Sequence, residues 1–436
     1  MQDIYDITIE HLYVMFKECD LILTDSRQVA SKVNEGFKVM FFALKGDRFD
    51  ANGFVEEVLE SGATCVVTSR KDIKDSRVAL YHDTLEALQR LAAHHREQLN
   101  CKVVAITGSN GKTTTKELMV AILSQKYSVA YTKGNFNNHI GVPLTLLSIK
   151  ESDEIAIVEH GANHIGEIKF LVTLSQPDFG LITNIGRAHI GEFGGVDGIV
   201  KAKGELYDYL KNNNKTLFYN TSLPYLSEMV RARADMQVVA YDESIVCQRE
   251  SDSLSDGVVF EYEELTITSN LIGSYNIHNI TAAIAVAQYF KLLPSQIKSA
   301  IEGYIPSNMR SQLVKTATNR VVVDAYNANP SSMLVAIENF AKHSQSRSIC
   351  ILGQMHELGS FSGVEHAKLV DTLVDLSLEA ILIGEHFKQA AKESDTKWFD
   401  SVESLIDSRE LERVQNYDIL LKGSRATSVE RLINYL

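Results

Sequence analysis

The sequence lacks a long apolar run, a basic leader and closely spaced cysteines. No apolar stretch approaches the roughly 20 residues that cross a bilayer, and the first six residues carry two acids where a signal peptide has basic residues. The five cysteines are odd in number, widely scattered and never in a C-x-x-C pair, which argues against a disulfide framework and a zinc site. We therefore expect a cytoplasmic protein with reduced thiols and no membrane insertion.

A continuous basic stripe is also missing. Lys and Arg number 43 against 56 Asp and Glu, so the formal net charge is -13, and nucleic acid is not expected as a partner. A chain that is 45% hydrophobic and 23% charged is typical of globular proteins and excludes collagen-like and disordered classes. At about 150 residues per domain, 436 residues predict three domains.

The pattern of the sequence changes near residues 100 and 306, which predicts domains at 1–99, 100–307 and 308–436. Apolar, β-branched runs predict strands at 39–44, 64–68, 102–107 and 155–159, and helical periodicity predicts helices at 84–98 and 275–290. Residues 257–267 alternate like an antiparallel pair, so we expect a mixed sheet in the middle domain. The fold class is therefore α/β.

The last third alternates short strands and helices. Strands are predicted at 321–323, 349–352, 380–383 and 419–421, with helices starting at 330 and 363. This alternation is typical of βαβ units around a mostly parallel sheet. A Rossmann-like C-terminal domain is expected.

A glycine-rich segment follows the strand predicted at 102–107. It reads Gly108-Ser109-Asn110-Gly111-Lys112-Thr113-Thr114 and leads into a helical pattern. Glycines allow successive backbone N–H groups to face one anion, and the helix N-terminus adds positive potential. Lys112 would reach the phosphates of a nucleoside triphosphate and Thr113 would hold Mg²⁺. Because the spacing departs from G-x-x-x-x-G-K-[ST], an ordinary strand-to-helix turn is the alternative.

A carboxylate ends the apolar strand predicted at 155–159. Nucleotide-binding α/β folds place a metal-binding acid at this edge of the sheet, so Glu159 is the candidate. An exposed acid at a strand end is the alternative. His139, His160 and His164 also lie close in sequence, but we expect no zinc site there.

Four segments together carry a family resemblance: residues 108–114, 134–143, 159–168 and 324–330. The chain resembles the Mur ligases over its whole length, and among them the branch that joins D-alanyl-D-alanine to UDP-N-acetylmuramoyl-tripeptide (UDP-MurNAc-tripeptide). The resemblance implies an N-terminal α/β domain that binds the UDP substrate, a central P-loop domain and a C-terminal Rossmann-like domain. It also implies a monomeric, ADP-forming amide ligase of peptidoglycan synthesis, in which ATP activates a carboxylate as an acyl phosphate and an amine then attacks it.

Site residues follow from the same resemblance. It implies ATP-binding residues Gly108, Ser109, Asn110, Gly111, Lys112, Thr113, Thr114, Asn276, Asn279, Arg310 and Asp324. It implies catalytic residues Lys112, Glu159, His189 and Lys203, with Thr113, Glu159, His189 and Lys203 at Mg²⁺ and Lys203 carbamylated to N6-carboxylysine. It implies substrate-binding residues Ser26, Arg27, Lys45, Asn135, Asn137, Asn138, Asn163, His164, Tyr326, Asn327 and Asn329. An ordinary turn role is the alternative for Asn137, Asn138 and Asn163.

Two other classes of function stay open at this stage. A sibling amide ligase would add the third residue of the peptide or extend folate with glutamate. The first would use an Asp-x-Pro-Arg loop that has no counterpart at residues 354–358, and the second begins close to its phosphate loop. An inactive nucleotide-binding homologue has no need of Lys112, Glu159, His189 and Lys203, yet all four are present.

Overall fold

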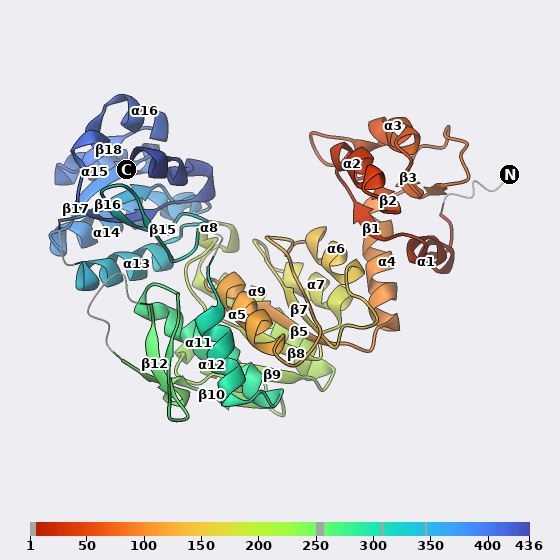
Figure 1. Cartoon of the computed structure of the whole chain (residues 1–436), viewed down its shortest axis with the longest axis horizontal. Helices are drawn as coiled ribbons and strands as arrows, with labels where there is room; N and C mark the ends of the chain where they lie inside the picture. The colour runs from red at the N-terminus through yellow and green to blue at the C-terminus, as the bar shows by residue number, and fades with distance from the viewer. Residues whose placement is uncertain (1–5, 250–256, 307–308, 345–346) are drawn as a thin grey trace. The chain divides into compact units, whose positions relative to one another are not determined.

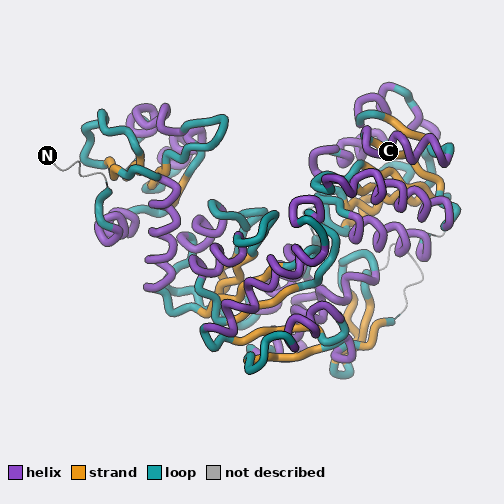
Figure 2. Tube along the Cα trace, turned by 180° about the vertical axis from the view of Figure 1, so that it is seen from behind, coloured by secondary structure: helices purple, strands orange, loops and turns teal. Residues whose placement is uncertain are grey.

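The computed structural model describes residues 6–249, 257–306, 309–344 and 347–436, and it is α/β throughout (Figures 1 and 2). The chain divides into two compact units, each made of separate segments. The first consists of residues up to 105, 128–161 and 167–179, and the second of residues 106–127, 162–166 and 180–436. Within these described ranges, every helix is too short or too polar to cross a membrane.

The first unit contains a four-stranded parallel sheet in the order β1-β2-β3-β4. Its strands are β1 (Leu21–Leu23), β2 (Val39–Phe42), β3 (Cys65–Thr68) and β4 (Val78–Leu80). Its helices are α1 (Ile9–Lys17), α2 (Val29–Asn34), α3 (Val55–Glu60) and α4 (Thr84–Gln98). The strands predicted near 39 and 64 and the helix predicted at 84–98 are confirmed.

One hydrophobic core of this unit joins distant parts of the sequence. Leu12, Phe42 and Leu88 belong to the same buried cluster as Leu146 and Val158. All five side chains are fully buried, and burial of such side chains is the main favourable contribution to folding. The early and later segments of the unit therefore stabilise one another.

A further sheet has six strands in the order β10-β9-β8-β5-β7-β6. They are β5 (Lys102–Thr107), β6 (Val129–Tyr131), β7 (Ile155–Glu159), β8 (Phe179–Ile182), β9 (Thr216–Asn220) and β10 (Gln237–Tyr241). The accompanying helices are α5 (Lys112–Leu123), α6 (Gly141–Leu147), α7 (Glu167–Ser175), α8 (Ile190–Phe193), α9 (Val196–Asn212), α10 (Pro224–Arg231), α11 (Ile277–Tyr289) and α12 (Pro294–Gly303). The strands predicted at 102–107 and 155–159 have these bounds in the structure.

The antiparallel pair predicted at 257–267 is present, but it does not make the central sheet mixed. The strand β12 (Val259–Tyr262) pairs with β13 (Leu265–Thr268) on one side and with the short β11 (Cys247–Gln248) on the other, in a separate three-stranded sheet. Glu263 and Glu264 both have positive φ, 43° and 65°, as a tight two-residue hairpin requires. Because the β12–β13 hairpin pairs with β11, the strand that precedes it in sequence, it forms its own sheet and adds no antiparallel strand to the central sheet.

The C-terminal sheet has the order β14-β15-β19-β16-β17-β18, and all its neighbours are parallel except β14 against β15. Its strands are β14 (Gln312–Lys315), β15 (Arg320–Asp324), β16 (Ser348–Gly353), β17 (Glu379–Ile383), β18 (Lys397–Phe399) and β19 (Asp418–Lys422). Its helices are α13 (Pro330–His343), α14 (Ser362–Asp375), α15 (Lys388–Ser394) and α16 (Val402–Asp407). The predicted strand–helix alternation is confirmed, and Asp324 and Lys422 end adjacent strands in register.

A buried histidine in α14 holds the loop after β16. His366 is fully buried; its Nε2 accepts a hydrogen bond from the Met355 N–H at 3.0 Å, and its Nδ1 donates to the Ser362 carbonyl at 2.8 Å. Burial, together with the smaller effect of the neighbouring His386 and His356, lowers the pKa of His366 to about 4. The folded protein therefore keeps this ring neutral.

The pKa of His366 predicts a loss of stability in acid. An unfolded histidine has a pKa of about 6.5, so the unfolded chain binds the extra proton first as pH falls from about 6.5 to about 4. We expect His366 to cost about 2–3 kcal/mol of unfolding free energy over this window. Urea unfolding of wild type and His366→Gln at pH 7.5 and 4.5 measures it, and equal pH dependence of the two proteins would contradict it.

Candidate active site

The phosphate loop is shaped by two glycines between β5 and α5. Gly108 and Gly111 have φ values of 143° and 77°, where a side chain is strained. A Cβ on Gly108 would collide with Thr183, and one on Gly111 with Asn279. Only glycine fits both positions, and the turn they make leads directly into the N-terminus of α5, which favours a bound anion.

A segment after β8 holds the backbone of this loop. The Ser109 N–H donates to the Asn184 carbonyl at 3.0 Å, and the Asn110 N–H donates to Asn184 Oδ1 at 3.0 Å. The Asn110 carbonyl accepts from Thr183 Oγ1 at 2.6 Å and from Asn184 Nδ2 at 3.1 Å. Sequence reasoning missed Thr183 and Asn184 as loop supports, although polar residues directly after a buried strand are a usable signal.

Lys112 lies on the loop that precedes it. Its Nζ donates to the Gly108 carbonyl at 2.7 Å and to the Ser109 carbonyl at 3.3 Å. Thr113 and Thr114 are buried in the first turn of α5. The predicted ammonium thus lies at the glycine turn, where it can neutralise a bound phosphate.

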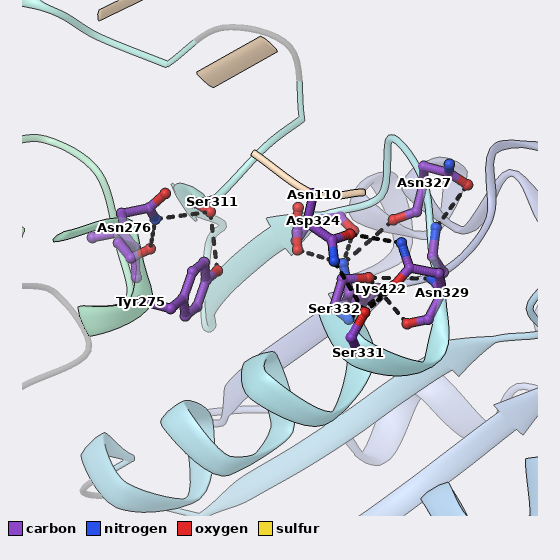
Figure 3. Close-up of polar contacts among 12 residues, drawn as sticks. Asn110, Tyr275, Asn276, Ser311, Asp324, Asn327, Asn329, Ser331, Ser332 and Lys422 are labelled. Carbon is purple, nitrogen blue, oxygen red and sulfur yellow. Dashed lines mark hydrogen bonds and ion pairs between the residues drawn. The ribbon is translucent and has the colours of Figure 1, made fainter. Parts of the chain in front are cut away.

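Asn276 and Asn279, expected near ATP, form a buried polar chain to α5. Thr115 Oγ1 donates to Asn279 Oδ1 at 3.1 Å, and Asn279 Nδ2 donates to Asn276 Oδ1 at 2.9 Å. Asn276 Nδ2 donates to the Ile272 carbonyl at 2.8 Å and to Ser311 Oγ at 3.3 Å, the latter drawn in Figure 3. In the structure the two amides brace the helix that carries the phosphate loop.

His189 lies in a group of three potential metal ligands. Its Nδ1 is 2.8 Å from Glu357 Oε2 and 3.3 Å from Glu192 Oε2, and the pKa of Glu357 is lowered by its hydrogen bond to His189. The three ligand atoms lie within 4.8 Å of one another. His189 was predicted, whereas Glu192 and Glu357 were missed because nothing in their spacing marks them.

Lys203 is buried in the middle of α9. The residue is 2% exposed, and its Nζ lies 5.5 Å from the centre of the Phe193 ring. Conversion to a carbamate would supply oxygen ligands, which suit Mg²⁺.

Glu159 ends β7 in the first unit and is almost fully buried. Its Oε1 accepts from Asn137 Nδ2 at 2.9 Å, and its backbone N–H donates to Thr132 Oγ1 at 2.9 Å. The predicted substrate residue Asn137 therefore contacts the predicted metal ligand in the same unit. The burial and fixed orientation of this carboxylate fit a hard cation such as Mg²⁺.

Other predicted substrate residues lie in loops near β6 and β7. Asn138 Oδ1 accepts from the N–H groups of Ile140 and Gly141 at 3.1 and 2.9 Å, so its amide fixes the turn into α6, while Asn135 in the same loop is exposed. In the second unit Asn163 is partly buried and His164 is exposed.

The predicted uridine-nucleotide residues lie in the first unit. Arg27 pairs with Asp25 through hydrogen bonds of 2.9 and 2.8 Å, which lowers the pKa of Asp25 to about 2. The side chains of Arg27 and Lys45 are 86% and 74% exposed, while Ser26 is partly buried. Two exposed cations beside loop backbone are available to a diphosphate.

Of the residues predicted after β14 and β15, Asn329 lies beside Asn110 of the phosphate loop (Figure 3). The Arg310 guanidinium carbon lies 3.7 Å from the centre of the Tyr326 ring, and that of Arg425 lies 5.7 Å from it, distances that allow cation–π attraction. Asn327 Oδ1 accepts from the Ala328 N–H at 2.8 Å. Arg310 and Tyr326 are thus brought together.

A buried ion pair fixes Asp324, another predicted ATP residue. Lys422 Nζ donates to Asp324 Oδ2 and, at 3.3 Å, to the Asn327 carbonyl. The Lys422 side chain is 1% exposed and that of Asp324 is 17% exposed. The pair orients Asp324 and the loop that follows it.

Removing Lys422 is expected to destabilise the protein. Lys422→Met leaves Asp324 without its cation, which should cost about 3 kcal/mol of unfolding free energy. Lys388→Met, which breaks an exposed pair with Glu385, is the control and should cost less than about 1 kcal/mol. Thermal or urea unfolding of both variants tests this, and equal losses would refute the role of the buried pair.

The chain is similar to known proteins over nearly its whole length. Residues 106–287 match the family model of the Mur ligase middle domain. Residues 309–425 match that of the "Mur ligase, glutamate ligase domain". The chain is 34% identical over 412 residues to the UDP-N-acetylmuramoyl-tripeptide–D-alanyl-D-alanine ligase of Bacillus subtilis, covering 91% of this chain and 90% of that one. This chain belongs to the Mur ligase family.

Two solved Mur ligases have the same fold over almost the whole chain. MurF from Acinetobacter baumannii is 33% identical with a TM-score of 0.84, covering 95% of this chain and 92% of that one. MurF from Thermotoga maritima, solved in complex with ADP, is 25% identical with a TM-score of 0.81, covering 97% of both chains. The three-domain α/β architecture expected from the sequence is that of this family, while the residues at which the domains meet stay a prediction.

Proposed function

We propose that this Mur ligase is an ADP-forming ligase that joins D-alanyl-D-alanine to UDP-MurNAc-tripeptide. The phosphate loop carries the proposal, because its two obligatory glycines and Lys112 form a site for the phosphates of ATP. Relatives named for this activity match 91% and 95% of the chain, which supports the choice of substrates. The product would be the UDP-MurNAc-pentapeptide of peptidoglycan synthesis.

The proposed chemistry needs an activated carboxylate. A carboxylate is a poor electrophile, and transfer of the terminal phosphoryl group of ATP to it supplies a leaving group for attack by the dipeptide amine. Lys112 would neutralise charge on the transferred group, and the first turn of α5 would orient it. Arg310 and Asp324 would contact the nucleotide from the C-terminal part of the second unit.

Mg²⁺ is proposed as the cofactor beside ATP. Thr113, Glu159, His189 and Lys203 would hold it, with Lys203 as N6-carboxylysine; a bound Mg²⁺ neutralises phosphate charge during transfer. The buried Glu159 carboxylate and the buried Lys203 support this assignment. The asparagines at 135, 137, 138, 163, 327 and 329, with His164 and Tyr326, are proposed for the peptide substrates, and Ser26, Arg27 and Lys45 for the uridine nucleotide. A monomer in the cytoplasm is proposed from the same family membership.

Phosphate release from ATP tests the function directly. The assay contains Mg²⁺ and UDP-MurNAc-tripeptide with D-alanyl-D-alanine, with a single amino acid, or with no amine. Release that requires the dipeptide, with a pentapeptide product by mass spectrometry, is the expected result. Turnover of a single amino acid on a dipeptide precursor would indicate a sibling ligase, and no turnover with any acceptor would indicate a nucleotide-binding homologue without activity.

A further inference from the structure

The side chain of Asn110, in the middle of the phosphate loop, is held by the start of α13. Asn110 Nδ2 donates to Ser331 Oγ at 3.0 Å, and Asn110 Oδ1 accepts from Asn329 Nδ2 at 2.7 Å (Figure 3). Its backbone N–H and carbonyl are bonded to Thr183 and Asn184. Both ends of this side-chain amide thus depend on residues more than 200 positions later in the chain.

Ser331 is the centre of this contact. Its hydroxyl donates to Asn329 Oδ1 at 2.9 Å and accepts from Asn110 Nδ2 and, at 3.2 Å, from the Arg187 N–H. One donor and two acceptors are the full capacity of a hydroxyl group. Asn329 in turn caps α13, because its Oδ1 accepts from the Ser332 N–H at 3.0 Å. Asn110, Asn329 and Ser331 therefore form one hydrogen-bonded node, which links the loop before α5 to the start of α13.

Two glycines, Gly186 in the loop after β8 and Gly191 in α8, lie against neighbouring segments without room for a side chain. A Cβ on Gly186 would lie 2.7 Å from Ser331 Oγ and 3.0 Å from Asn110 Nδ2, and one on Gly191 would lie 2.6 Å from the Gly359 nitrogen. Neither glycine has a positive φ, so the backbone there suits any residue and only the lack of space demands glycine. The lack of space at Gly186 is evidence, separate from the hydrogen bonds, that Ser331 and Asn110 are closely packed.

We infer that Ser331 and Asn329 are positioning residues that set the phosphate loop for nucleotide through Asn110. They act on Asn110, whose neighbours Ser109 and Gly111 form the turn around the phosphates. A loop already held in its binding geometry loses less conformational freedom when nucleotide binds. Without the node the loop must be ordered by the nucleotide itself, so affinity falls. The inference rests on the proposed function only in taking ATP as the ligand of this loop.

Adjacent serines provide a matched test. Ser331→Ala removes the node, whereas Ser332→Ala removes a hydroxyl that reaches only Asn329 in the same helix cap. Asn329→Ser keeps a capping oxygen and removes the amide that reaches Asn110. Since a hydrogen bond contributes about 1 kcal/mol, Ser331→Ala, Asn329→Ser and Asn110→Ala should each raise the Kd for ADP with Mg²⁺ about fivefold. Ser332→Ala should stay within about twofold of wild type.

The double variant separates positioning from a general structural effect. If Asn110 and Ser331 act as one unit, Asn110→Ala/Ser331→Ala should bind ADP no more weakly than about the worse single variant. In Ser331→Ala the KM for ATP should rise while the KM for the dipeptide stays unchanged. Equal ADP affinity in the Ser331 and Ser332 variants, or effects that multiply in the double variant, would overturn the inference.

Calorimetry with ADP keeps this test separate from the proposed function. ADP binding needs no acceptor, so the coupling between Asn110 and Ser331 can be measured even in a protein that rejects D-alanyl-D-alanine. Failure of the acceptor assay with intact coupling would overturn only the proposed function. Loss of coupling in a protein that makes the pentapeptide would overturn only the positioning role.

Discussion

Lys112→Ala is expected to lower the rate of phosphate release by about 10²–10³-fold, the usual cost of removing one preorganised charge from a phosphoryl-transfer site. In the structure the ammonium lies against the carbonyls of Gly108 and Ser109, so it reaches the turn that would hold the phosphates. Steady-state phosphate release with saturating ATP measures the effect.

A second lysine provides the control for Lys112. Lys102 begins the same strand, β5, and is exposed, so Lys102→Ala should leave the rate within about twofold of wild type. Circular dichroism and thermal unfolding should show that Lys112→Ala is folded. A folded Lys112→Ala protein that keeps more than a tenth of the wild-type rate would remove Lys112 from the catalytic site.

Lys203→Ala is expected to lower activity by about 10²-fold or more, and added formate or acetate should restore part of it. The carboxylate would enter the space left by the side chain and replace the oxygens of the proposed carbamate. Lys203→Arg should be inactive and should not respond, because a guanidinium fills the site and offers no oxygen. Rates with and without the added acid give the result.

Lys201 is the matched control for Lys203. It lies two residues earlier in α9 and is exposed, so Lys201→Ala should keep its activity and gain nothing from acetate. Mass spectrometry of the native protein should find one added CO₂ that is absent from Lys203→Ala. Full activity of Lys203→Ala without any additive would exclude the carbamate from the mechanism.

The elements that the sequence predicted best are those whose pattern is local. The strand at 102–107 and the helix at 84–98 have uniform apolar or amphipathic periodicity and clear ends, since Asp83 caps that helix by accepting from two backbone N–H groups. The separate sheet of β11, β12 and β13 was not predicted. Alternation shows that a strand pairs, but its partner depends on the path of the chain, which a local pattern does not contain.

The residues of the candidate site also fall into two groups, those that a local sequence pattern predicts and those that it does not. The glycines and Lys112 of the phosphate loop have a sequence signature because backbone geometry imposes it locally. Ser331 and Glu357 have none: each reaches the middle part of the chain only because β15 and β16 lie in a folded sheet. Long-range side-chain contacts of this kind need the structure.

The interleaved segments of the two units set the order in which the chain can fold during synthesis. The cluster around Leu12 and Leu88 is completed by Leu146, Val158 and Leu171, so a nascent chain that ends near residue 105 would still expose part of its apolar surface. Residues 106–127 must likewise wait for those after 180. Such late completion leaves partly folded chains open to aggregation, and a ribosome pausing before residue 180 would prolong that exposure.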